Sequence, residues 1–491
     1  MAKILRFLLL FAILAALWCG LLWFGLPQEW TQGYLRSPSL LTLIVAHAGP
    51  PFFVATAWKL VQLVWGWRVN RASNTAVKKE SRKKQTALET AQTAHQKELA
   101  RLRARVDCRA IWAAVSEIPK WFGDGVAQCA LIPQDTKEIH QAGREAALIP
   151  SLRSVFERAL MECEAAPFLP VMLATSDPAH QGWTKQAWHE VMTARGIEHY
   201  PSQSFAVLPV PPVVADETKP SSSLPERLIT LFEENPDLPA VILVGMDSPM
   251  ADSPPPSMFL VDPEEARKPK PSHAVVALLL SRPGLSAPGG EIDSTVVPVR
   301  DADPYTPFWE REQHTKRTAA LDTPGWGRVP LPLRPAFLQT CPPIATLHRT
   351  STIPTPGPKR RILIEQLHQT SEKALIHAGL RDLPFEGNPP PPEAPESLLS
   401  GWLIHNVIPM RLGLVTNAFL AHGHELEPIK ETSHIEDTHG DTGAARSVLM
   451  LAEALIRSVQ LNLPVVVTEV SANESIHIGL VRPVLEEESA T

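Results

Sequence analysis

The sequence predicts a layered α/β fold in which one structural unit recurs. Three segments share a pattern: a helix with apolar residues at three- and four-residue spacing, a Leu-Pro link, and a continuous apolar strand followed by Ser or Asp. Strands that are apolar along their whole length are typical of sheets covered by helices on both faces. Proline fits just before such a strand, where its missing N–H costs least. We therefore expect a parallel sheet between helices.

The three units lie far apart in the chain. The first is a helix at Ser151–Leu160 with a strand at 171–175, the second a helix at Ser223–Phe232 with a strand at 240–244, and the third the helix that follows His439-Gly440-Asp441-Thr442-Gly443-Ala444-Ala445 with a strand at Val465–Val470. Further strands are expected at Ala274–Leu280 and Ile476–Val481, and a long helix at Gly401–Ala421. Recurrence of the unit predicts an internally duplicated domain.

Two apolar runs near the N-terminus predict a transmembrane hairpin. Leu8–Leu26 carries no charge and is close to the ~20 residues that cross a bilayer. Leu40–Trp58 is the second run, and Pro50-Pro51 inside it leaves open a re-entrant or interfacial segment. Basic residues lie before the first run and after the second, which favours both ends on the cytoplasmic side over a signal anchor with a periplasmic body. The expected location is the bacterial inner membrane, multi-pass, with a large cytoplasmic domain.

Residues 72–109 predict a polar helix that acts as a juxtamembrane stalk. Nucleic-acid binding is not expected, because no aromatic interleaving or known motif accompanies its basic residues and the net charge of the chain is −6. We assign residues 1–70 to the hairpin, 71–110 to the stalk, 111–290 to an N-terminal α/β half, 291–355 to a Pro-rich connection and 356–491 to a C-terminal α/β half.

The C-terminal third resembles the second half of thiolase-fold ketosynthases in Gly440–Ala445, the helix after it and the Pro-introduced strand. The strand Ala240–Ser248 is similar to a ketosynthase strand that ends in Gly-Val-Asp-Ser. Such enzymes are internal duplications. As a whole, the chain resembles the type VI lipase adaptor family, which has a ketosynthase-like body. That resemblance implies a protein that holds a lipase-type toxin effector and delivers it to the VgrG spike of the type VI secretion system.

A ketosynthase needs a nucleophilic cysteine at a helix N-terminus and two histidines. None of the five cysteines sits at a strand-to-helix turn; they are Cys19, Cys108, Cys129, Cys163 and Cys341. Their odd number and the absence of C-x-x-C spacing favour free thiols in a reducing compartment. His439 lies four residues before Gly443, whereas the ketosynthase pattern has three. We therefore assign no catalytic residue.

Two further groups of polar residues are weighed as sites. The densest set of metal-ligand types is His422, His424, Glu425, His434, Asp437, His439 and Asp441. Because this segment reads as a polar loop, we interpret it as surface histidines and assign no metal. Asp177 and Asp247-Ser248 follow strands, where open sheets bind ligands, but turn and cap chemistry explains them as well. No cofactor-binding motif is present, so no cofactor is assigned.

The sequence thus favours a membrane-tethered, non-enzymatic adaptor or chaperone with a thiolase-like α/β domain and a protein partner. One alternative is a membrane-associated acyl-transfer enzyme of the same fold, with a displaced pair such as Cys341 and His439. The other is a structural component of a membrane complex.

Overall fold

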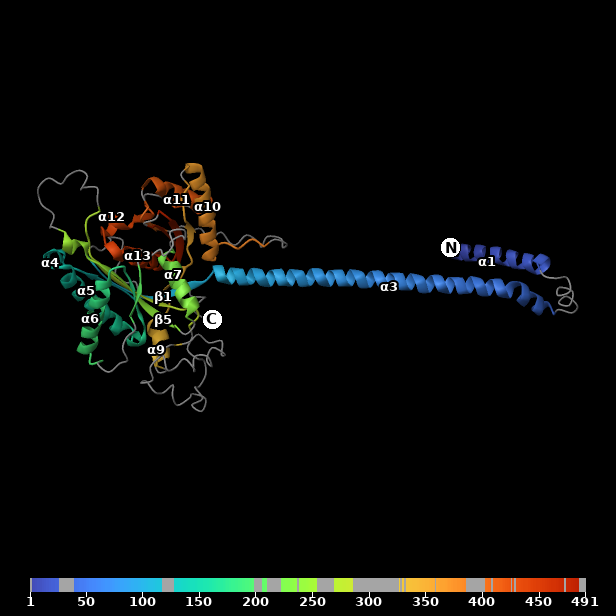
Figure 1. The fold of residues 1–491 in the computed structure, drawn as a ribbon, viewed down its shortest axis with the longest axis horizontal. Helices are drawn as coiled ribbons and strands as arrows, with labels where there is room; N and C mark the ends of the chain where they lie inside the picture. Colours follow the sequence, from blue (N-terminus) through green and yellow to red (C-terminus); the bar gives the residue numbers. More distant parts are fainter. Residues whose placement is uncertain are drawn as a thin grey trace, which may run out of the picture. The chain divides into compact units, whose positions relative to one another are not determined.

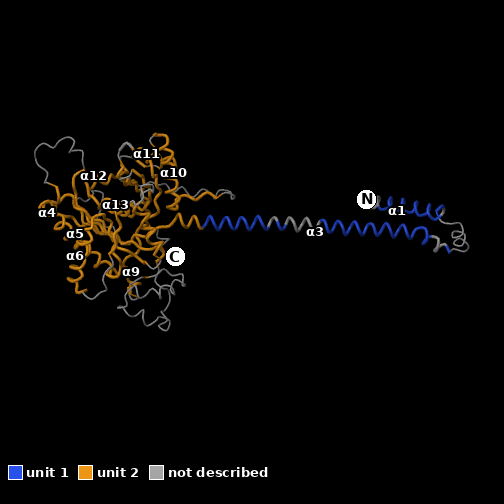
Figure 2. The backbone as a smooth tube through the Cα atoms, viewed as in Figure 1, with its two compact units in different colours: residues 1–96 blue, residues 97–491 orange. Residues whose placement is uncertain are grey.

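The structure is a computed structural model, and the description below concerns the residues whose placement it defines: 2–25, 39–116, 128–197, 205–209, 222–235, 238–253, 269–285, 326, 329–330, 333–357, 359–385, 402–407, 409–424, 426–427, 430–471 and 474–484. The chain divides into two compact units, residues 1–96 and residues 97–491 (Figure 2).

The first unit is helical. Helix α1 (Ala2–Gly20) continues into the π-helical turn η1 (Leu21–Gly25), and helix α3 (Leu40–Leu102) begins after the next segment. The two helices pack together: Trp18 donates its indole N–H to the carbonyl oxygen of Ala46 at 2.9 Å, and the Phe11 ring meets Phe52 edge-on.

The membrane assignment made from the sequence is wrong. Among the helices in the described part of the chain, none combines the length and the apolar character that crossing a bilayer requires. The run Leu40–Trp58, expected to be a separate span, is instead the first part of α3, which continues without a break through Pro50 and Pro51 and then through basic residues to Leu102. The predicted multi-pass inner-membrane location with a cytoplasmic domain is withdrawn.

The second unit is built on one mixed sheet (Figure 1). Its strands are β1 (Arg105–Val115), β2 (Cys129–Pro133), β3 (Val171–Ala174), β4 (Phe205–Leu208), β5 (Ala240–Asp247), β6 (Ala274–Ser281), β7 (Ala345–His348), β8 (Ser351–Ile353), β9 (Leu403–His405), β10 (Thr432–His434), β11 (Val465–Val470) and β12 (Ile476–Pro483). The strand order is β10-β9-β11-β12-β7-β1-β6-β5-β3-β4, with β2 paired to β1 and β8 to β12.

This order contains the same motif twice. Numbered one to five along the chain, the strands of the first half are β1, β3, β4, β5 and β6, and those of the second half are β7, β9, β10, β11 and β12. From the outer edge of the sheet to its centre, the strands of both halves follow the order three, two, four, five, one. In both halves the fifth strand is antiparallel to its two neighbours and the other neighbouring pairs are parallel. The halves meet where β1 pairs antiparallel with β7. The predicted layered, internally duplicated α/β domain is confirmed, but the expectation of a parallel sheet is wrong, because the sheet is mixed.

The helices of this unit are α4 (Thr136–Gln141), α5 (Arg144–Glu162), α6 (Pro178–Ala194), α7 (Leu224–Glu234), α9 (Leu333–Thr340), α10 (Arg360–His377), α11 (Pro409–Leu420), α12 (Ile435–His439) and α13 (Arg446–Leu461). They form three layers. Helices α5 and α6 cover the outer face of the first half, α10 and α11 cover the outer face of the second, and α7 and α13 share one core with the inner faces of both. Along β5, Ile242 packs outward and Leu243 inward, so the strand is buried on both faces as its composition predicts.

Three boundaries differ from the expected ones. The stalk helix ends at Leu102, and residues from Arg105 onward form β1. The helix expected at Gly401–Ala421 is strand β9 followed by the shorter α11, and the segment 291–355 contains α9, β7 and β8. The Pro-rich run 388–392 lies outside the described residues.

Candidate functional site

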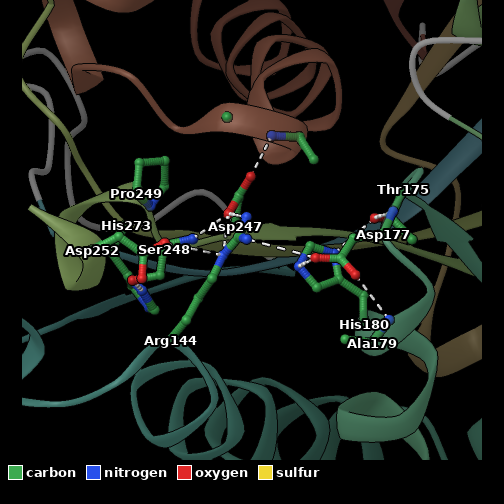
Figure 3. Close-up of polar contacts among 12 residues, drawn as sticks. Arg144, Thr175, Asp177, Ala179, His180, Asp247, Ser248, Pro249, Asp252 and His273 are labelled. Atoms are coloured by element: carbon green, nitrogen blue, oxygen red, sulfur yellow. Dashed lines mark hydrogen bonds and ion pairs between the residues drawn. The ribbon is translucent and has the colours of Figure 1, made fainter.

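The carboxyl ends of β3 and β5 form the first candidate site. Open sheets bind ligands where neighbouring strands are connected in opposite directions. Strands β3 and β5 meet this condition, because β3 leads through outer helix α6 to β4, and β5 is reached through inner helix α7. Asp247 is the last residue of β5 and Asp177 follows β3. Figure 3 shows Arg144, the first residue of α5, reaching between these two carboxylates.

The Asp247 carboxylate is buried, with 4% of the residue exposed, and it accepts hydrogen bonds from three directions. Arg144 donates through Nε at 3.1 Å and also through Nη2. The main-chain N–H groups of Ser248 and Ala444 donate at 2.7 and 2.8 Å. A buried carboxylate needs such donors to offset its lost hydration. Asp247 is therefore engaged by the chain itself, and a ligand would have to compete with these contacts.

Asp177 has a local role. Its side chain accepts from the N–H of Ala179 at 2.9 Å and so caps α6. Arg144 Nη1 lies 3.6 Å from its other oxygen, and His180 Nε2 lies 3.7 Å from it. Burial lowers the pKa of His180, more than the charge of Asp177 raises it. The cap interpretation thus fits Asp177, while Asp247 also ties distant segments together.

His273 completes this cluster and was not singled out from the sequence. Its ring joins the Ser248 hydroxyl through Nδ1 and the Ser151 hydroxyl of α5 through Nε2, both at 2.9 Å. Burial lowers the pKa of His273 to about 4, so the ring is neutral at pH 7. Its only sequence signal is its position just before the apolar strand β6.

The turn Gly440–Gly443 docks the second half onto the first. The main-chain N–H of Asp441 donates to the carbonyl oxygen of Lys270 at 2.7 Å, and the main-chain carbonyl oxygen of Asp441 accepts from the N–H of Ser272 at 2.8 Å. Gly440 and Gly443 have φ of +77° and +53°, which glycine adopts without strain. A Cβ on Gly443 would overlap the Asp247 carboxylate. The turn that looks most like an active-site element is thus a contact between the halves.

The equivalent strand ends of the second half hold the second candidate site. His405 of β9 and His434 of β10 occupy paired positions, with ring centroids 5.1 Å apart. The pKa of His405 is lowered to about 4, mainly by burial and to a smaller extent by the neighbouring His434. On the inner face, Glu469 of β11 accepts from the Ser447 hydroxyl at 2.6 Å, and burial raises the pKa of this carboxyl group.

The residues of metal-ligand type that were interpreted as surface histidines do not form one group, although His434 Nδ1 lies 3.6 Å from Asp437 Oδ2. His439 faces Glu453 of α13, with Nε2 3.5 Å from Oε2, and His422 instead stacks against His368. Asp441 belongs to the docking turn, and Glu425 lies outside the described residues. In the part of the chain that the structure describes, no three His, Cys, Asp or Glu side chains are arranged to hold a metal ion.

The cysteines of the second unit are buried or partly buried free thiols. Cys163 caps the C-terminus of α5 and Cys341 follows α9. The suggested displaced pair is not brought together: Cys341 Sγ contacts the carbonyl oxygen of Glu162 in the outer core of the first half, whereas His439 contacts α13. Burial raises the pKa of Cys108 well above its usual value and that of Cys129 to about 12.

A cavity of about 10 Å³ lies between the halves, beside the N-terminus of α7. Ser223, Thr350, Glu469 and His477 contribute its polar lining. Ser223 caps α7 and shares a hydrogen bond with the Thr350 hydroxyl at 2.5 Å. A cavity of this size admits about one water molecule. It has no room for a substrate.

Comparisons with known proteins give only distant structural similarities. No protein-family profile matches the sequence, and no curated protein matches it. Similar solved structures include OleA of Xanthomonas campestris bound with cerulenin (8% identity, 77% of this chain and 97% of that chain, TM-score 0.34). They also include acetyl-CoA acetyltransferase from Syntrophomonas wolfei (9%, 78% and 100%, 0.40) and a ketosynthase from the bacillaene synthase of Bacillus subtilis (8%, 78% and 71%, 0.38). At these values the similarities carry no argument.

Fold and site together define the class of this protein. It is an internally duplicated, mixed α/β domain in which the chain's own side chains occupy the strand ends of the first half, attached to a helical segment.

Proposed function

We propose that the chain is a non-enzymatic adaptor or chaperone whose α/β unit binds a protein partner. The observation that carries this proposal is the engagement of Asp247 at the first strand-end site. Its carboxylate is held by Arg144 and by the N–H groups of Ser248 and Ala444. Open α/β sheets bind their ligands at such strand ends. Here Asp247 of the first half instead contacts the N–H of Ala444 in the second half.

The interior between the halves supports the same conclusion. Acyl transfer through a covalent intermediate needs a nucleophile with a base in hydrogen-bond reach. Ser223 at the start of α7 contacts a hydroxyl group and the N–H of Glu226, and neither is a base. The adjoining cavity of about 10 Å³ is too small for an acyl group.

The partner we propose is a lipase-type toxin effector, with the VgrG spike as the destination of the complex. The support is the resemblance to the type VI lipase adaptor family. In the test, the tagged full-length chain is mixed with a purified lipase-type effector and, separately, with VgrG, and complexes are measured by size-exclusion chromatography and calorimetry. We expect a stoichiometric complex with the effector. If neither protein binds, this proposal is wrong.

Matched variants separate binding from chemistry. Replacing Cys341 or His439 with Ala should leave effector binding within about twofold of the parent chain, provided that thermal unfolding shows a folded variant. Loss of binding in a folded Cys341→Ala or His439→Ala chain would contradict the adaptor proposal.

An acyl-transfer enzyme is the second candidate, and one observation favours it: the pKa of the Cys341 thiol is lowered, first by the neighbouring Cys163 thiol. Intact-mass spectrometry after incubation with acetyl-CoA tests this candidate. We expect no added acetyl group. An acetyl group that appears on the parent chain and disappears in Cys341→Ala would establish the enzyme and overturn the adaptor proposal.

A further inference from the structure

Two thiols from distant parts of the chain lie side by side in the outer core of the first half. Cys163 is the C-cap residue of α5 and Cys341 is the residue after α9; 0% and 1% of them are exposed. Cys341 Sγ lies 3.5 Å from the carbonyl oxygen of Glu162, the residue before Cys163. Cys163 and Cys341 belong to the same outer-core cluster, and each thiol shifts the pKa of the other.

A buried arginine lies next to this pair. Arg109 of β1 is 2% exposed and donates through Nε to the Ser281 hydroxyl at 2.6 Å and through Nη1 to the carbonyl oxygen of Cys341 at 2.7 Å. Its guanidinium also lies over the Phe337 ring, 5.1 Å from the centroid. None of these three partners is an anion. The charge of Asp107 also acts on Arg109. A buried cation favours any nearby group that can take a negative charge.

Cys341 is the thiol of this pair whose pKa is lowered. The neighbouring Cys163 thiol lowers the pKa of Cys341 more than burial raises it, and the Thr340 hydroxyl and the charge of Arg109 lower it further. The same contact raises the pKa of Cys163, and burial raises those of Cys108 and Cys129. Because the thiolate is the reactive form, Cys341 is the prepared nucleophile and Cys163 the neighbouring thiol that can resolve its oxidation product.

We propose that Cys341 and Cys163 form a peroxide-reactive pair that closes to an intramolecular disulfide. The Cys341 thiolate attacks one oxygen of hydrogen peroxide, the O–O bond breaks, and hydroxide leaves, so that Cys341 becomes a sulfenic acid. The Cys163 thiol then attacks the Cys341 sulfur, the S–O bond breaks, and water leaves with the Cys163 proton. Together the two thiols lose two electrons and peroxide gains them.

The bond would join the end of α5 to the segment that leads from α9 into β7, the first strand of the second half. It would close a long loop containing β3 to β6, which restricts the unfolded chain and raises the thermal midpoint. Peroxide is small enough to reach the pair during local opening of the core.

The test uses the full-length chain and hydrogen peroxide. After treatment, free thiols are blocked with N-ethylmaleimide and the chain is digested without reductant. We expect a cross-linked peptide containing Cys163 and Cys341, lighter by two hydrogens than the sum of its parts, and lost on reduction with dithiothreitol. Cys129 is the internal control: it is more exposed than Cys341, but its pKa is raised to about 12, so it should stay reduced longer.

Two variants sharpen the result. In Cys163→Ala, dimedone should trap a sulfenic acid on Cys341, because the resolving thiol is gone. Ser281→Ala keeps the charge of Arg109 and should leave cross-linking unchanged, whereas Arg109→Gln should slow it at least severalfold. The proposal fails if the parent chain yields no Cys163–Cys341 peptide, or if Cys129 is oxidised before Cys341.

Discussion

Lowering the pH from 7.5 to 5.5 is expected to remove most of the folding stability of the α/β unit. Five buried histidines share a lowered pKa, for which burial is the largest cause: about 4 for His273, His377, His405 and His477, and about 3 for His348. At most 9% of each is exposed. They are neutral in the folded chain at pH 7 and titrate near pH ~6.5 once unfolded.

The sign follows from proton binding. Between pH 6.5 and about 4 the unfolded chain binds protons at these histidines and the folded chain does not, so stability falls as the pH falls through this window. Each group contributes up to about 1.4 kcal/mol per pH unit, and the five together up to about 7 kcal/mol per unit. A domain of ordinary stability, about 5–15 kcal/mol, would unfold within this range.

Urea unfolding followed by circular dichroism at pH 7.5, 6.5 and 5.5 measures this effect. The midpoint should fall steeply below pH 6.5, and His273→Gln, which keeps a hydrogen-bonding side chain, should reduce the slope by about one fifth. A midpoint that stays constant from pH 7.5 to 5.5 would show that these rings are not buried and neutral.

Gly443→Ala should be among the most destabilising single substitutions in the chain. The residue has φ of +53°, and a Cβ there would overlap the Asp247 carboxylate that Ala444 N–H and Arg144 hold in place. The carboxylate is buried and cannot move without losing these donors. We expect a loss of about 3 kcal/mol or more in the free energy of unfolding.

Gly284→Ala is the matched control for this substitution. Gly284 has φ of +68°, but nothing lies within 4 Å of a Cβ built on it, so it should show only the backbone cost of about 1–2 kcal/mol. In a chain that also carries Asp247→Gly, the cost of Gly443→Ala should fall toward that of Gly284→Ala, with the Pro249 ring still 3.2 Å from the added Cβ. Equal costs for both glycines in the parent chain would mean that the turn does not press on Asp247.

The recurring units were predictable because they depend on local patterns. Strand β5 is apolar along most of its length, β11 begins with Val465, Val466 and Val467, and both follow Leu-Pro. These apolar residues are buried because the sheet is covered on both faces. The order of the strands was not predictable, since pairing of β1 with β7 joins segments far apart in sequence. The internal duplication could be inferred from the sequence only because the helix, Leu-Pro and strand unit recurs.

Strand β1 shows where a local pattern misleads. Arg105, Asp107 and Arg109 alternate with apolar residues and follow a charged helix, so the segment reads as the end of that helix. In the structure Arg109 is buried through contacts with Ser281, Phe337 and Cys341, none of which is near it in sequence. Only these distant partners make a charged residue acceptable in a buried strand.

The candidate site was predictable by position but not by role. Asp247 and Asp177 were placed at strand ends, and the cap formed by Asp177 follows from local turn chemistry. The link from Asp247 to Ala444 depends on how the two halves meet, which a single sequence does not reveal. The apolar N-terminal runs show the opposite limit: composition alone predicted a membrane hairpin that the described helices do not bear out.

The position of α13 has a consequence for synthesis on the ribosome. Strands β1 to β6 of the first half are complete by Ser281, yet α13, which packs against β5 and β6, begins only at Arg446. Val448 of α13 packs directly against Gly245 of β5, since a Cβ built on Gly245 would lie 2.6 Å from the Val448 side chain. Until α13 emerges, the nascent first half lacks the helix that covers Leu243 and Leu278. Ribosome-bound chains in which α13 has not yet left the exit tunnel should therefore aggregate or recruit general chaperones, and chains in which it has emerged should do so less.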